Sequence, residues 1–161
     1  MNGARVGITA ARRAQEQATL VGALGGVPVI GPTIDIDRPA PDDDVAGQLR
    51  AALATPVDTV VVMTGIGARH VMAVAERTGL TDQLRALCTS AFVIARGQKA
   101  RAALRRLDLR SDVVADPPES RGVLHQLTTR GLAGHRLMVI CGGPTPDPFV
   151  APIRAAGAQV C

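Results

Sequence analysis

Aromatic residues are almost absent from this sequence, which has two phenylalanines, Phe92 and Phe149, and no tyrosine or tryptophan. Proteins that bind single-stranded nucleic acid stack the bases on exposed aromatic side chains, so the composition argues against that class. Cysteine is scarce as well. The three cysteines, Cys88, Cys141 and Cys161, lie far apart and form no Cys-x-x-Cys pair. Neither a zinc site nor a disulfide framework is indicated, and we expect buried, reduced thiols.

The sequence also lacks a membrane segment, because no uninterrupted apolar run approaches the roughly 20 residues that a spanning helix needs. The amino-terminal residues 1–5 lead into a short predicted strand rather than into the apolar core of a signal peptide. We therefore expect a cytoplasmic protein without membrane contact. With 161 residues, 47% of them hydrophobic, the chain can form an ordinary core.

The net charge is +4, and it is unevenly distributed. Residues 1–80 hold seven Arg against eight acidic residues, whereas residues 81–161 hold ten Arg and Lys99 against six, which gives −1 and +5. Arginine suits bidentate binding of carboxylate or phosphate, and codon bias in a GC-rich genome is the alternative explanation for its abundance. A basic half would also suit nucleic acid, but the arginines are scattered along the sequence and form no stripe.

Short β-branched runs alternate with helical spacing along the chain, a pattern typical of an α/β protein with open parallel sheets flanked by helices. The clearest strand, residues 59–63, is apolar on both faces and is followed by a Thr/Gly loop, with helical spacing restored from residue 71. Four or five parallel strands are expected in residues 34–161. The further strands are predicted at residues 91–95, 111–115, 136–140 and from 157 on, and the further helices at residues 12–24, 42–55, 81–87 (with Thr81 or its neighbour as cap), 100–107, 121–129 and 149–156.

Residues 1–33 are predicted to form a β-α-β unit with one helix to cover two strands. Isoleucine and aspartate then alternate at residues 34–37, as in an exposed strand or a linker. We interpret this as the passage from one domain, residues 1–33, to a second, residues 34–161. Because the first part is too small for a core of its own, we expect it to self-associate through partly exposed apolar residues, namely Val6, Ile8, Val29 and Ile30.

Small residues follow four of the predicted strands, at the ends where open α/β sheets bind their ligands. Such residues expose backbone amides, and a helix start adds N–H groups that attract anions. We therefore predict an anion site to which Arg69 and Lys99 contribute charge; for Arg69 the alternative is an ordinary solvated residue in a first helical turn. The candidate binding residues are Thr9, Thr64, Gly65, Gly67, Arg69, Gly97, Gln98, Lys99, Gly142 and Gly143.

No nucleophile–base pair, carboxylate pair or cluster with metal-ligand spacing occurs in these loops, so the sequence identifies no catalytic residue and no metal site. The Gly65-x-Gly67 pair lacks the third glycine of a dinucleotide fingerprint, since position 70 is His, and a GxxxxGK[ST] phosphate loop is also lacking. Of the histidines, we expect His125 to be partly buried in a helix and His135 to lie in a turn.

Several segments occur in a familiar order. Val-Gly-Ile-Thr at residues 6–9 precedes a Gln/Glu-rich helix, and Gly-Gly-Val-Pro-Val-Ile at 25–30 precedes the alternating linker. Residues 60–68 look like an apolar strand followed by Thr-Ser-x-x-Gly, and residues 93–100 like a strand followed by Gly-x-x-Thr-Ala. With the Pro turn at 112–117 and the end of the chain, 155–160, these segments together resemble the uroporphyrinogen-III synthase family over nearly the whole chain.

The resemblance implies a two-domain fold in which both chain ends build domain one and the middle builds domain two, so that domain one is incomplete here. It implies a lyase of haem biosynthesis that cyclises hydroxymethylbilane to uroporphyrinogen III, with inversion of the last ring and without a cofactor. This octacarboxylate substrate would lie between the domains, held largely by backbone N–H groups. We expect residues 1–161 alone to be inactive, because such a cleft must close from both sides.

The sequence departs from the family pattern at three places. The serine that follows the central threonine is Gly65 here, residues 142–146 replace an Arg-bearing loop, and the chain stops before the second linker with its tyrosine. Some relatives carry the domain fused to a DNA-binding region. The alternative function is therefore a regulatory domain of a longer protein that binds a tetrapyrrole or another anion.

Overall fold

The structure is a computed structural model that describes residues 1–33, 42–143 and 147–161. The chain divides into two compact units, Met1–Pro39 and Ala40–Cys161, which are described one at a time. The predicted linker strand at residues 34–39 lies outside the described residues. No helix in the described ranges combines the length and the apolarity that crossing a membrane requires.

The first unit is a β-α-β unit, as the sequence predicts. Strand β1 (Arg5–Ile8) pairs in parallel with β2 (Val27–Ile30), and helix α1 (Ala14–Ala23) connects them. The helix is followed by Gly25, whose φ of 74° lies in the left-handed region that glycine adopts without steric cost.

The first unit buries little of its apolar surface. Within residues 1–33 only Ile8 and Ala18 are buried. Val29 and Ile30 are exposed as expected and Val6 is half-buried, but the prediction for Ile8 is wrong, because this side chain is buried at the end of β1. The further exposed large apolar side chains of this unit are Met1, Leu20, Leu24 and Val27.

The second unit is built on a five-stranded parallel sheet with the strand order β5-β4-β3-β6-β7. This confirms the expected sheet of four or five strands. The central strand β3 places Val61 opposite Ile94 on one side and opposite Val139 on the other. The strands are β3 (Thr59–Val62), β4 (Phe92–Ala95), β5 (Val113–Val114), β6 (Arg136–Ile140) and β7 (Gln159–Val160).

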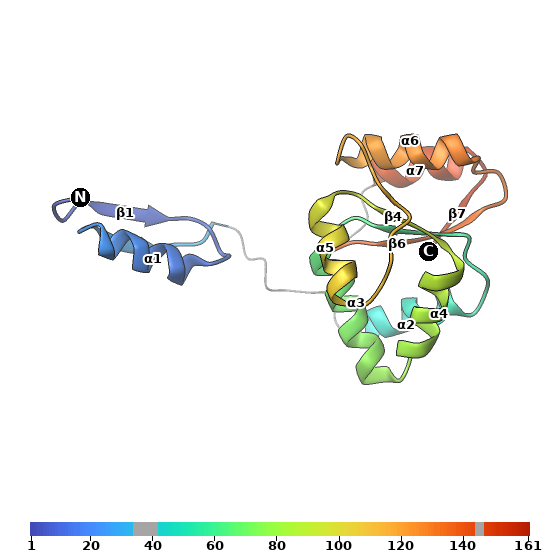
Figure 1. Cartoon of the computed structure of the whole chain (residues 1–161), viewed down its shortest axis with the longest axis horizontal. Coiled ribbons are helices and arrows are strands. Elements are labelled where there is room, and N and C mark those ends of the chain that lie inside the picture. The colour runs from blue at the N-terminus through green and yellow to red at the C-terminus, as the bar shows by residue number, and fades with distance from the viewer. Residues whose placement is uncertain (34–41, 144–146) are drawn as a thin grey trace. The chain divides into compact units, whose positions relative to one another are not determined.

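Helices cover both faces of this sheet (Figure 1). One face carries α2 (Asp42–Leu53), α3 (Gly65–Thr78), α4 (Thr81–Ser90) and α5 (Gln98–Arg106), and the other carries α6 (Ser120–Arg130) and α7 (Asp147–Ala155). Successive residues of β3 serve the two layers alternately: Val60 and Val62 pack with Met72, whereas Val61 packs with Phe149. The continuous apolar run of β3 is therefore explained by burial on both faces.

Three helices begin at least two residues earlier than the sequence predicts. Helix α3 starts at Gly65 rather than near residue 71, α5 at Gln98 rather than at residue 100, and α7 at Asp147 rather than at residue 149. For α3 the reason is that glycine disfavours a helix by about 1 kcal/mol, so that Gly65 and Gly67 suggested a loop. The N-cap position of α4 is occupied by Leu80, the neighbour of Thr81, and no side chain there caps the helix by a hydrogen bond.

The three cysteines differ in burial. All are free thiols, but only Cys88 is buried, while Cys141 is half-buried and Cys161 is exposed, so the expectation of three buried thiols is wrong. Burial raises the pKa of the Cys88 thiol to about 11, against the lesser opposing effect of Arg110 and Arg85. Cys88 is therefore a neutral core residue at physiological pH.

Candidate functional site

Strands β3 and β6 lie side by side, but the chain leaves them in opposite directions across the sheet. β3 leads to β4 and β5 on one side, and β6 leads to β7 on the other. The helices that follow them, α3 and α7, cover opposite faces. In open α/β sheets this switch point, beyond the carboxyl ends of the strands, is where ligands bind. The candidate site is therefore the junction of the segments after β3 and β6.

Thr64 begins helix α3 and determines which of its amides are free. Its hydroxyl Oγ1 accepts a hydrogen bond from the Gly67 N–H at 3.0 Å, so the amide of Gly67 is already used. The amides of Gly65 and Ile66 occupy the first two helical positions, where no intrahelical acceptor exists. These two N–H groups are the ones that this helix start offers to an anion.

Gly67 holds the loop after β6 against the first turn of α3. A β-carbon on Gly67 would lie 2.3 Å from the Cys141 carbonyl oxygen and 3.0 Å from the Gly142 nitrogen. On the other side of this junction, a β-carbon on Gly142 would lie 3.0 Å from Thr64 Oγ1. Gly67 is buried and positions the two segments, and its part in ligand binding stays a prediction. Gly143 is exposed, with open space around it.

Gly65 brings the starts of α3 and α5 together. A β-carbon there would lie 2.9 Å from the Ala103 Cβ, 3.0 Å from the Lys99 carbonyl oxygen and 3.6 Å from an Arg69 guanidinium nitrogen. Arg69 and Lys99 are both exposed at this junction. Within the described residues neither side chain takes part in an ion pair. Both cations are therefore available to a ligand.

Helix α5 starts without a side-chain cap, since Gly97 precedes it in an extended conformation. The first amides of the helix, at Gln98 and Lys99, are on exposed residues. A β-carbon on Gly97 would lie 3.1 Å from the Pro118 Cβ, so the segment after β5 packs against this start. A helix start carries about half a positive charge, so α3 and α5 together with their two cations are a candidate anion site.

Ile66 is a member of this site that the sequence analysis did not single out. It is 39% exposed, and it is the one exposed large apolar residue in the described part of the second unit. Its Cβ lies 3.9 Å from where a Gly142 β-carbon would be. The site therefore offers an apolar contact beside its free amides. The signal in the sequence was an isoleucine between two glycines after a buried strand.

Thr9 follows β1 in the first unit and is exposed. Its carbonyl oxygen accepts a hydrogen bond from the Thr33 N–H at 3.2 Å. Its part in the site stays a prediction. His125 is exposed, so its predicted partial burial is wrong. No cluster of His, Cys, Asp or Glu in the described ranges could hold a metal ion.

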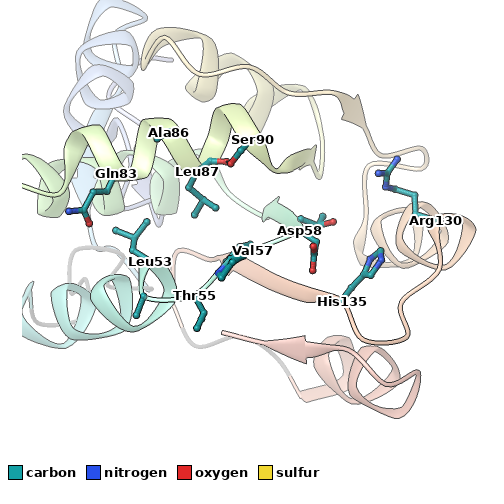
Figure 2. A pocket seen from close by; sticks show the side chains of 13 residues that line it. Leu53, Thr55, Val57, Asp58, Gln83, Ala86, Leu87, Ser90, Arg130 and His135 are labelled. Atoms are coloured by element: carbon teal, nitrogen blue, oxygen red, sulfur yellow. The ribbon is translucent and has the colours of Figure 1, made fainter.

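A groove of about 900 Å³ lies beside the amino end of β3, at the end of the strands opposite to the candidate site (Figure 2). Leu53, Val57 and Leu87 form its apolar part, and Asp58, Arg130 and His135 lie together at one end. Two of these polar side chains serve the fold. Asp58 accepts a hydrogen bond from the Arg136 backbone N–H at 2.8 Å, and the guanidinium of Arg130 lies 3.6 Å from the ring centre of Phe92. None of the predicted binding residues lines this groove.

The fold is that of a doubly wound α/β protein, and the glycine-rich junction at its switch point is a candidate anion site. Residues 15–161 match the family described as "Uroporphyrinogen-III synthase HemD". The chain therefore belongs to the uroporphyrinogen-III synthase family.

Solved structures agree with this membership. The chain resembles a mutant uroporphyrinogen III synthase of the extremely thermophilic bacterium Thermus thermophilus with a TM-score of 0.80 and 26% identity, over 98% of this chain and 60% of that one. For the wild-type enzyme in another crystal form the TM-score is 0.68, at 26% identity over 98% and 59%. The uncharacterized protein YjjA of Bacillus subtilis (strain 168) is 29% identical over 158 residues, which are 98% of this chain and 58% of that protein. The chain thus spans about 60% of the length of these relatives.

Proposed function

We propose that the second unit forms one wall of the substrate site of a uroporphyrinogen-III synthase and that it binds the carboxylates of hydroxymethylbilane. The observation that carries the proposal is the junction at Gly65 and Gly67, where two helix starts and the loop after β6 meet beside Arg69 and Lys99. We further propose that residues 34–161 make up domain two and residues 1–33 a part of domain one. The protein would act in the cytoplasm, in haem biosynthesis.

The wall supplies binding and orientation. The amides of Gly65, Ile66, Gln98 and Lys99 would donate to substrate carboxylates, because amides at a helix start combine free N–H groups with the positive end of the helix dipole. The exposed side chain of Ile66 would contact the apolar surface of a pyrrole ring. An octacarboxylate makes many such contacts at once, so no single side chain needs to dominate.

The reaction requires orientation of the two ends of the substrate more than it requires a catalytic side chain. The hydroxyl of hydroxymethylbilane leaves as water after protonation, a cation forms at the same carbon, and closure onto the inverted last ring releases a proton. A cleft closed from both sides holds the two ends of the chain together and keeps water from the cation. The replacement of the family's serine by Gly65 is compatible with this role, because the close packing of α3 on α5 there leaves no room for a side chain.

The test is a titration with uroporphyrin, a fluorescent octacarboxylate, whose own emission is followed because the chain has no tryptophan or tyrosine. We expect Lys99→Glu and Arg69→Glu each to weaken binding on the order of tenfold at low salt, with a smaller effect at high salt. The matched controls are Arg50→Glu and Arg154→Glu, which make the same change of charge at the last turns of α2 and α7. Equal affinities for all four variants and the parent at low salt would refute the proposal.

A further inference from the structure

Helix α5 carries an exposed basic face that extends beyond the anion site. Its cations are Lys99, Arg101, Arg105 and Arg106, all exposed, and it contains no acidic residue. None of the four takes part in an ion pair with any residue in the described ranges. Three of the arginines, Arg101, Arg105 and Arg106, are thus presented with Lys99 on the surface of one helix.

The four cations form two rows. At 100° per residue, Lys99 and Arg106 share one side of the helix, while Arg101 and Arg105 share the other, about 130° around the axis. Between the rows the outward ridge is formed by Gln98 and Ala102, which are uncharged and exposed. Like charges four residues apart destabilise a helix slightly, and no acid within α5 offsets that cost.

The chemistry of this face excludes two kinds of partner. The apolar residues of α5, Ala100, Ala103 and Leu104, are buried in the core of the unit, so the helix has no apolar face to insert into a membrane. The second unit exposes no aromatic side chain in its described residues, so stacking on single-stranded bases is not available. What remains is an extended polyanion with its charges at the surface.

We propose that the exposed face of α5 binds the phosphate backbone of double-stranded nucleic acid. A duplex presents two parallel rows of phosphates across a groove about 12 Å wide, which admits an α-helix, and α5 presents two rows of cations across an uncharged ridge. An acidic polypeptide offers no comparable pair of rows. Since the contacts go to phosphate, the binding is independent of sequence, with a Kd of about 10⁻⁴–10⁻⁶ M at physiological salt.

The test measures fluorescence anisotropy of a labelled 20-base-pair duplex, titrated with the protein at several salt concentrations. The variant is the triple substitution Arg101→Gln, Arg105→Gln and Arg106→Gln. Its control is Arg12→Gln, Arg50→Gln and Arg154→Gln, which removes the same charge from exposed positions on other helices and loops. We expect the α5 triple variant to bind the duplex on the order of tenfold more weakly than the parent does. The slope of log K against log salt concentration should decrease in magnitude by about three, and the control triple variant should have an affinity and a slope close to those of the parent.

Further measurements keep the result interpretable. Thermal unfolding of both triples verifies folding, and uroporphyrin affinity of the α5 triple close to the parent's separates this surface from the anion site. The proposal is overturned if the parent does not bind the duplex at 50 mM salt or if the two triples lose affinity equally. It is also overturned if poly-glutamate displaces the labelled duplex as well as unlabelled duplex does at equal charge, since the surface would then suit an acidic polypeptide.

Discussion

Gly67 and Cys141 are in backbone contact: a β-carbon on the glycine would lie 2.3 Å from the Cys141 carbonyl oxygen. This contact joins the first turn of α3 to the end of β6, across the switch point of the sheet. Neither partner can move aside as the end of a flexible side chain could, because the crowded atoms belong to the backbone.

We expect Gly67→Ala to lower the free energy of unfolding by about 2 kcal/mol, since overpacking outweighs the better helix propensity of alanine. The control is Gly143→Ala in the same loop, where a β-carbon meets nothing within 4 Å and the change should stay within about 0.5 kcal/mol. Urea unfolding of both variants measures the difference. If the two variants are equally stable, the junction is not as closely packed as described.

Thr64→Val removes the cap of α3 and keeps the shape of the side chain. We expect a loss of about 1 kcal/mol in stability, because the Gly67 N–H loses its acceptor, together with weaker uroporphyrin binding. Thr81→Val is the matched control, since Thr81 begins α4 without a role as its cap. Thermal unfolding measures the stability of the two variants, and the uroporphyrin titration measures their affinity. Equal stability and equal affinity of the two variants would contradict the assigned role of Thr64.

Ionisation of the Cys88 thiol should lower the stability of the folded protein at alkaline pH. Its pKa is raised from 9.0 to about 11 in the folded protein because burial disfavours the thiolate. The contribution of the protonated thiol to the free energy of unfolding is therefore complete below pH 9 and is lost as the pH rises from 9 to about 11. Across this window the stability difference between the parent and Cys88→Ala should fall by on the order of 2–3 kcal/mol.

Urea unfolding of the parent and of Cys88→Ala at pH 8, 9, 10 and 11 measures this difference, in which the titration of all other groups cancels. A stability difference that stays constant with pH would show that the thiol is not protected by burial. Alkylation by iodoacetamide supplies an independent readout, because exposed Cys161 should react well before Cys88 at pH 8.

We expect residues 1–161 by themselves to produce no uroporphyrinogen III above the uncatalysed background. The first unit leaves Leu20, Leu24 and Ile30 exposed, so it offers no finished second wall for a cleft. A coupled assay that separates the type III isomer from the spontaneously formed type I isomer tests this. Type III product from the purified chain would contradict the expectation and indicate that two copies complete the cleft.

The sequence predicted the parallel sheet because burial on both faces leaves an unmistakable pattern, as in Val60, Val61 and Val62. It predicted Gly65 and Gly67 as site residues but assigned them to a loop. The reason is that a glycine selected for close approach to Cys141 looks the same, in a sequence, as one selected for a turn. The close approach of Gly65 to Ala103 depends on the packing of α3 on α5, which a local sequence pattern does not show. The basic face of α5 was missed for a similar reason, since Lys99 and the three arginines form two rows only in a helix.

The outer strands of the five-stranded sheet, β5 and β7, are two residues long, so they offer little template for pairing between molecules. The first unit differs, because its two strands are four residues long and pair only with each other among the described residues. The backbone N–H groups of Val27 and Gly31 point to β1, so position 28 between them faces the outer edge of β2, where Pro28 has no N–H to donate. The outer edges of β5 and β7 are thus protected by their shortness and that of β2 by Pro28, whereas β1 has neither a short length nor a proline. Any strand exchange between chains should therefore begin at residues 5–8.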